Sequence, residues 1–121
     1  MTGDRIEVRG LRLLGTHGLL PEERGRPQPL EIDLDLALDM EGAAASDSLD
    51  DTADYGAAIA AAAAVVAGPR HDLLESLAGA IAAAVLGDPR VTSVTVAVRK
   101  LRPPVPYDVA STGVRLTRSR A

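Results

Sequence analysis

Hydrophobic and polar residues alternate along four segments of the chain, and a period of two residues predicts β-strands. Residues 4–15 alternate with a change of phase around Gly10, as a β-bulge produces. Residues 91–100 and 111–119 alternate as well. The clearest alternation, over residues 30–40, predicts a long antiparallel strand with one buried and one solvated face. Its apolar positions are Leu30, Ile32, Leu34, Leu36, Leu38 and Met40, and its acidic positions are Glu31, Asp33, Asp35 and Asp39.

Two segments between the second and third strands predict helices. Residues 55–67 are rich in alanine, which has the highest helix propensity, with Asp54 as a candidate N-cap and a Gly-Pro pair as the stop. Residues 72–86 carry apolar residues at helical spacing before the next Gly and Pro. The expected core stripe of this second helix is Leu73, Leu77, Ile81 and Val85. Residues 42–54 are small and acidic, and they predict a loop.

The predicted order is strand, strand, helix, helix, strand, strand. This order indicates an α+β fold in which a four-stranded antiparallel sheet carries two helices on one face. Residues 1–121 are enough for one domain with a single core. The long sheet edges favour pairing with another chain, so we expect a symmetric assembly.

The amino-acid composition of the chain disfavours several classes of protein function. The formal net charge is -4 and the aromatic residues are two tyrosines, which disfavours nucleic acid as a partner. The chain has no cysteine and two histidines, so neither disulfides nor a typical zinc site are expected. The first ten residues lack an apolar signal core, and the longest apolar run has 11 residues against about 20 for a membrane span. We expect a cytoplasmic protein that does not bind a membrane.

Lys100 is the only lysine of the chain. Alternation places it on the same strand face as Val94, Val96 and Val98. One interpretation is a cation at a strand end, with its stem on apolar surface and its head in water. The other is chemical, because a desolvated lysine, unlike arginine, can lose its proton and act as an acid or base.

Three other segments carry polar residues that each have a structural interpretation. In the loop GTHGLLPEER, Glu22 and Glu23 could form a solvated turn, and His17 could satisfy a loop carbonyl. Tyr55 could begin a helix with its hydroxyl in water. Glu75 lies in the first turn of the second helix, where a carboxylate interacts favourably with the helix dipole. Only the combination of these residues indicates a specific chemistry.

Taken in order, the motifs resemble those of the dihydroneopterin aldolases of folate biosynthesis. They are a Gly-x-His-Gly loop with a glutamate five residues after its second glycine, Asp-Thr-x-x-Tyr-Gly, Leu-Leu-Glu at a helix start, and a strand-ending lysine followed by prolines. The resemblance covers essentially the whole chain. It implies a tunnelling fold, in which four subunits join their sheets into a barrel ring and two rings commonly stack into an octamer.

The same resemblance implies which residues bind the pterin. Glu75 corresponds to the glutamate that accepts hydrogen bonds from the pterin amino group and ring NH, and the backbone at Leu74 adds a polar contact. Tyr55 and the backbone around Ala53 and Asp54 correspond to residues that the neighbouring subunit supplies. A small pterin and further copies of this chain are therefore the expected partners.

Catalytic roles follow from the resemblance too. Lys100 corresponds to the catalytic acid or base, and Tyr55 is expected to share its proton transfers. Glu23 corresponds to the loop glutamate that faces the hydroxylated side chain of the substrate, while Glu22, one residue away, stays a second candidate. Dihydropterin already contains an imine that can accept electrons, so we expect no cofactor, no metal and no Schiff base.

One departure from the family leaves the substrate open. The family usually has proline directly after its lysine, whereas here Leu101 follows Lys100. A Lys-Leu pair is closer to the related dihydroneopterin triphosphate epimerases, which invert C2′ on the same fold, whereas the intact Gly-Thr-His-Gly loop is closer to the aldolases. An oligomer that binds pterin without catalysis is the third hypothesis.

Overall fold

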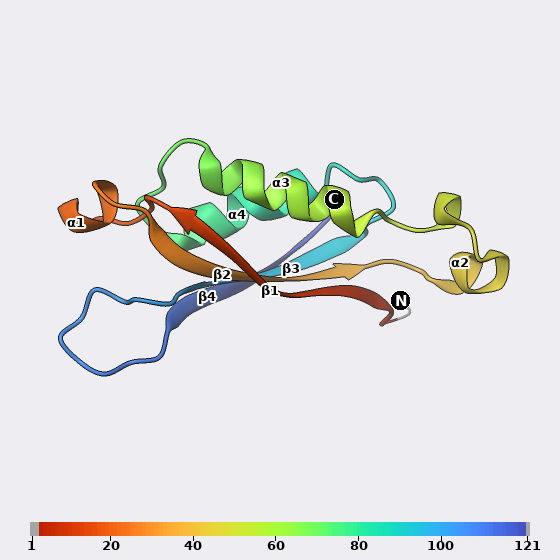
Figure 1. Cartoon of the computed structure of the whole chain (residues 1–121). Coiled ribbons are helices and arrows are strands. Elements are labelled where there is room, and N and C mark those ends of the chain that lie inside the picture. The colour runs from red at the N-terminus through yellow and green to blue at the C-terminus, as the bar shows by residue number, and fades with distance from the viewer. Residues whose placement is uncertain (1–2, 121) are drawn as a thin grey trace.

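The computed structural model describes residues 3–120 and has two layers, a twisted antiparallel sheet with two helices on one face (Figure 1). The strands hydrogen-bond in the order β1-β2-β3-β4, so β2 and β3 are central and β1 and β4 form the edges. The strands are β1 (Arg5–Gly15), β2 (Gln28–Ala37), β3 (Ser93–Lys100) and β4 (Thr112–Ser119). The predicted α+β class and the four antiparallel strands are confirmed.

The predicted bulge lies in β1. The register between β1 and β2 shifts between Val8 and Leu11, and Gly10 has φ of 70°, a left-handed conformation that favours glycine. The Gly10 N–H, which the bulge removes from the strand ladder, donates to Asp33 Oδ1 at 2.8 Å. The bulge restores the apolar phase, because Val8 pairs with Leu34 and Leu11 pairs with Ile32 on the core face.

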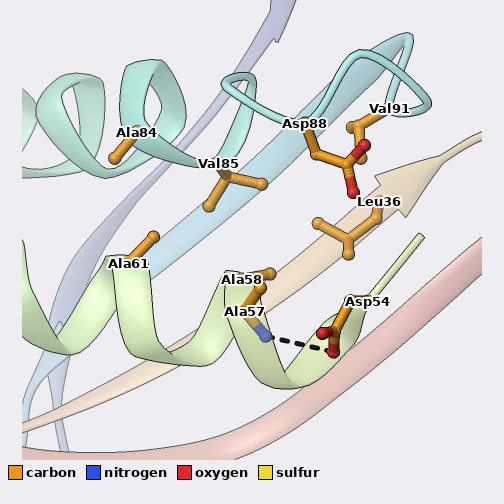
Figure 2. Close-up of a pocket in the computed structure, with 9 residues that line it drawn as sticks. All are labelled: Leu36, Asp54, Ala57, Ala58, Ala61, Ala84, Val85, Asp88 and Val91. Carbon is orange, nitrogen blue, oxygen red and sulfur yellow. Dashed lines mark hydrogen bonds between the residues drawn. The ribbon is translucent and has the colours of Figure 1, made fainter.

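The two long helices begin and end close to the predicted bounds. They are α3 (Tyr55–Ala67) and α4 (Leu74–Val85). Asp54 is confirmed as the N-cap of α3, since its side chain accepts from the Ala57 N–H at 3.2 Å (Figure 2). Alanines of both helices face each other above Leu36 and leave a small cavity of about 80 Å³ between them. Small side chains thus allow the two helices to approach closely over the sheet.

The core lies between these helices and one face of the sheet. Leu30, Ile32, Leu34 and Leu36 of β2 are at most 1% exposed, as are Val94, Val96 and Val98 of β3. In α4, Leu77, Ile81 and Val85 are buried as predicted, but Leu73 is half exposed, so that part of the stripe was wrong. Leu73 precedes the helix as an extended residue, with φ of -115° and ψ of 144°, and therefore lies off the helical face.

Three predicted segments differ in detail. Residues 42–54 are not a plain loop, because they contain most of α2 (Glu41–Ser46) and a short 3₁₀ helix, η1 (Leu49–Asp51). Ser48 stabilises η1 by accepting from the Asp50 N–H at 3.2 Å. A further helix of four residues, α1 (Pro21–Arg24), interrupts the loop before β2. The strand predicted to reach residue 40 ends at Ala37, although Leu38 stays buried.

The opposite face of the sheet is polar. Arg99 Nη2 donates to Glu31 Oε1 at 2.5 Å and to Asp33 Oδ2 at 3.0 Å, which joins β3 to β2. Arg9 of β1 pairs with the buried Asp35 at 2.6 Å. None of the helices within residues 3–120 combines the length and apolar character needed to cross a bilayer.

Candidate active site

A groove of about 390 Å³ opens at the end of the sheet where β3 stops and α4 begins. Its walls come from the segment leading into α1, the start of α4, the proline-containing loop after β3 and the first residues of β4. In Figure 1 this is the end of the molecule that carries α1 and the long loop between β3 and β4. Four of the predicted site residues line it, namely Glu23, Leu74, Glu75 and Lys100.

The centre of the groove is an ion pair between Lys100 and Glu23. Lys100 Nζ donates to Glu23 Oε2 at 2.5 Å, and the two side chains are 17% and 6% exposed. Lys100 pairs with Leu30 on β2 and with Thr112 on β4, so both neighbouring strands hold its backbone. A charge this sheltered requires a partner, and Glu23 supplies it. The interpretation of Lys100 as a solvated strand-end cation therefore does not fit the structure.

Glu23 reaches Lys100 because of how α1 begins. Pro21 occupies the first helical position, where its missing N–H costs nothing, and Glu23 is the third residue of the helix. From there its Oε1 accepts from the Leu20 N–H at 3.4 Å, the backbone contact that a glutamate makes at this position of a helix start. Glu22 lies one residue earlier on α1, is exposed and does not line the groove.

Glu75 borders the other side of the groove. Its side chain is exposed in the first turn of α4, where the positive end of the helix dipole favours a carboxylate. Leu74 is the first residue of that helix, and the first N–H groups of any helix lack an acceptor within it. A carboxylate and backbone donors therefore border the same opening.

A separate group of predicted residues lies away from this groove. Ala53, Asp54 and Tyr55 line a different cavity of about 510 Å³, together with Leu49 and Arg90. They lie at the beginning of α3, whereas the groove adjoins the segment that follows its end, and 13 helical residues span about 20 Å. Tyr55 is 62% exposed. Within one protomer the structure does not bring Tyr55 to Lys100.

Two polar residues of the groove were not identified from the motifs. Asp72 lines it and forms an ion pair with Arg70, and Thr112 lines it from β4 opposite Lys100. Neither residue belongs to a motif, and the position of Thr112 depends on the register between β3 and β4. A register of this kind is a property of the folded sheet. Among residues 3–120, no three His, Cys, Asp or Glu side chains gather closely enough to bind a metal ion.

The ionisable groups whose pKa values shift lie on the polar face of the sheet. The hydrogen bond from Arg99, together with its charge, lowers the pKa of Glu31. Burial raises the pKa of Asp33, but hydrogen bonds from the Gly10 N–H and Arg99 outweigh that effect and lower it overall. The same carboxylates raise the pKa of Arg99. The folded protein therefore favours the charged forms of Glu31, Asp33 and Arg99 on this face.

Fold and groove together define an α+β protein with a single antiparallel sheet and a sheltered lysine-carboxylate pair at one end. A sequence model of dihydroneopterin aldolase matches residues 6–117, and the chain belongs to this family. A dihydroneopterin aldolase of Streptomyces coelicolor is 38% identical over 117 residues, covering 97% of this chain and 98% of its own. One of Streptococcus pyogenes serotype M1 is 35% identical over 118 residues, covering 97% and 99%.

Structural similarity extends over the same length. The Escherichia coli dihydroneopterin aldolase in complex with neopterin superimposes with a TM-score of 0.86 at 27% identity, covering 96% of this chain and 99% of that one. The match includes all four strands and both long helices, because it leaves out only a small part of the chain. The subunit architecture of the tunnelling fold that the motifs implied is thereby confirmed.

Proposed function

We propose that this protein cleaves 7,8-dihydroneopterin by a retro-aldol reaction, which releases 6-hydroxymethyl-7,8-dihydropterin and glycolaldehyde. The observation that carries the proposal is the sheltered Lys100–Glu23 pair in a groove that Glu75 borders. An amine able to transfer protons and a carboxylate able to bind a guanidine-like ring edge are the groups that this reaction requires. Membership of the family supports the assignment.

In the proposed mechanism, the carboxylate of Glu75 accepts two hydrogen bonds from the amino group and ring NH of the pterin. Lys100, as the neutral amine and acting through water, takes the proton of the C2′ hydroxyl. The C1′–C2′ bond then breaks, C2′ leaves as the aldehyde carbon, and the electron pair moves into the C6=N5 imine. Return of this proton to C1′, by Lys100 or Tyr55, moves the electron pair back to the C6=N5 imine and completes the product. Because the ring imine accepts the electrons, neither a lysine Schiff base nor a metal ion is needed.

We propose that each site is shared between two subunits. Tyr55 and the backbone at Ala53 and Asp54 come from a neighbouring copy, because within one protomer they lie at the far end of α3. Both β1 and β4 are edge strands, so joining β1 of one copy to β4 of the next would extend the sheet into a ring. The expected assembly is a ring of four subunits, with two rings stacked into an octamer.

Mixing two impaired variants tests this shared site. Tyr55→Phe and Lys100→Ala are each expected to lose turnover, and rings formed after joint unfolding and refolding in equal amounts will contain both variants. Each proposed site takes Lys100 from one subunit and Tyr55 from the adjacent subunit. Each of the two residues is intact in half of the subunits, so about a quarter of the sites regain both groups. Recovery to about that level supports the shared site. No recovery, or a fully active monomer in light scattering, contradicts it.

The charges of the groove favour an unphosphorylated substrate. Glu23, Asp72 and Glu75 line it as carboxylates, and the excess negative charge comes from Glu75, because Lys100 pairs with Glu23 and Arg70 pairs with Asp72. A triphosphate would be repelled by this excess of negative charge. We therefore expect dihydroneopterin to have the higher kcat/KM when it and its triphosphate are compared side by side.

Epimerisation at C2′ is the second candidate, because Leu101 replaces the proline that usually follows the lysine. The Leu101 N–H donates to Pro29 O at 3.1 Å and extends the contact between β2 and β3, a bond that proline cannot make. Product analysis of both substrates decides between the candidates. Glycolaldehyde release from dihydroneopterin supports the aldolase, a faster inversion of the triphosphate supports the epimerase, and binding of neopterin without either product leaves only a binding protein.

A further inference from the structure

His17 is buried, 2% exposed, and the proposed chemistry does not use it. Its Nδ1 lies 3.0 Å from the His71 backbone nitrogen, and its Nε2 lies 2.8 Å from Val66 O. A backbone N–H only donates and a carbonyl oxygen only accepts. Nδ1 must therefore be the acceptor and Nε2 must carry the proton, so both ring nitrogens of a neutral imidazole are in use.

These contacts fasten the loop before α1 to the connection between α3 and α4. The Gly18 N–H donates back to His71 O at 3.0 Å, so residues 17 and 18 form a reciprocal pair of hydrogen bonds with the backbone of one residue. Arg70 Nη1 adds a third bond, to Gly18 O at 3.0 Å. Gly18 is thus fixed through its N–H, its C=O and the preceding side chain.

Gly18 in turn determines where Glu23 can lie. Its φ is 140°, and a Cβ placed on it would come within 2.4 Å of the Glu23 carboxyl carbon and within 2.4 and 2.7 Å of the two carboxylate oxygens. The Glu23 carboxylate therefore occupies the space that the missing side chain leaves. From there it reaches Lys100 at 2.5 Å.

We propose that His17 is a positioning residue that holds the Glu23 carboxylate on Lys100 through Gly18. The inference rests on the proposed function for its effect on turnover, but the contact itself can be measured without substrate. His17 also satisfies a carbonyl in the last turn of α3, which a purely structural helix cap would do as well. The test has to separate these two roles.

Two conservative substitutions of His17 each keep one of its two hydrogen bonds and remove the other. His17→Asn places an oxygen near the position of Nδ1 and keeps an acceptor for the His71 N–H, whereas His17→Gln places an amide near Nε2 and keeps a donor for Val66 O. His17→Ala keeps neither. The matched control is His71→Ala, which removes the other imidazole of the chain and leaves both backbone groups of residue 71.

Turnover supplies the first measurement. We expect His17→Ala to lower kcat by between about tenfold and a hundredfold, the scale of a misplaced catalytic group, with the Kd for neopterin little changed. His17→Asn should recover more kcat than His17→Gln, and His71→Ala should resemble wild type. If instead kcat follows Tm across the series, with Gln recovering as much as Asn, His17 is only a helix cap and the proposal is wrong.

A second measurement needs no activity. Since Lys100 is the only lysine, protein labelled with ¹⁵N and ¹³C lysine gives one set of lysine side-chain NMR signals. Glu23→Gln defines the chemical shift of Lys100 without its carboxylate partner, and His17→Ala and Gly18→Ala should both move the signal toward that value. A Lys100 signal that stays at the wild-type position in both variants overturns the proposal. Wild type that is inactive on dihydroneopterin overturns the proposed function instead, and the NMR result still decides the role of His17.

Discussion

Arg99 and Lys100 are consecutive residues of β3 that form ion pairs on opposite faces of the sheet. Arg99 joins two carboxylates of the neighbouring strand on the polar face, where all three side chains are between 15% and 27% exposed. Lys100 has one carboxylate partner, and that partner comes from a loop helix rather than from the sheet. Both closest contacts measure 2.5 Å, so distance does not distinguish the two pairs.

The difference lies in what each cation can do. The guanidinium of Arg99 stays protonated, and its carboxylate neighbours raise its pKa further. An ammonium such as Lys100 can give up a proton when its surroundings require it, and it faces an open groove. Strand β3 thus carries a permanent cation that joins it to β2 on one face, and a group suited to proton transfer on the other face.

Exchanging the two cations is the strongest test of this difference. Lys100→Arg and Lys100→Ala should both fold, assemble and bind neopterin, yet lose roughly two or more orders of magnitude in kcat, the scale of a positioned acid or base. Arg99→Lys should keep most of the turnover, because its position requires charge rather than proton transfer. Steady-state kinetics on all three variants, with circular dichroism as the folding control, measures this.

Two results would contradict this assignment. Wild-type turnover in Lys100→Arg would show that a permanent cation suffices in the groove as well. Borohydride added during turnover is expected to trap no substrate on the protein, because in the proposed mechanism the ring imine accepts the electrons. A mass increase on the peptide that carries Lys100 would replace acid-base catalysis with a Schiff base.

Glu75 is an anion of the same groove, and its proposed role is to bind the pterin rather than to transfer protons. In the proposed complex, Glu75→Ala leaves the donors of the pterin edge without a partner, and hydrogen bonds to a charged group contribute about 1.5–3 kcal/mol. We therefore expect the Kd for neopterin to rise by roughly ten- to a hundredfold in calorimetry. Unchanged neopterin affinity would place the pterin anchor elsewhere.

Glu22 and Glu23 give a matched pair within one short helix. Glu23→Ala removes the partner of Lys100 and should lower kcat by about tenfold or more, while exposed Glu22→Ala should be nearly silent. The two variants lose the same charge from adjacent positions, so a difference between them reports position rather than net charge. Equal losses of kcat would mean that the loop acts through its overall charge.

Sequence periodicity predicted the sheet and both long helices because their signals are local. The alternation over β2, the phase change at Gly10 and the N-cap at Asp54 are each contained in a few neighbouring residues, and all are confirmed. The prediction of Leu73 as a core residue was wrong, because the helix begins at Leu74 rather than at residue 72 and Leu73 therefore lies before its first turn.

The candidate site was less accessible to pattern analysis. Glu23, Glu75 and Lys100 were identified by the order of their motifs, but their convergence on one groove depends on contacts between distant segments. Alternation placed Lys100 on the apolar face, and motif spacing favoured Glu23 over Glu22 as the loop glutamate, yet no local pattern indicated that Glu23 would contact Lys100. The reason is the bonded Gly18 backbone, whose missing side chain makes room for the carboxylate.

The smallest expected effect concerns the Arg99 side of the comparison and its dependence on pH. Arg99 lowers the pKa of Glu31 in the folded protein from its ordinary value of 4.5, so the folded state favours the charged carboxylate. The resulting stabilisation is fully present above pH 4.5 and is lost as the pH falls through the lowered pKa of the folded state. Glu31→Gln removes the titrating group while keeping the shape of the side chain.

We therefore expect Glu31→Gln to lower Tm modestly at pH 7, and this difference from wild type should shrink as the pH falls below 4.5. Both proteins must be scanned at the same concentration, because the proposed assembly would make Tm concentration-dependent. Turnover at pH 7 should stay close to wild type, since Glu31 faces away from the groove. A Tm difference that is independent of pH would show that the glutamate acts by packing. A large loss of turnover would show that the two faces of β3 are not separate in function.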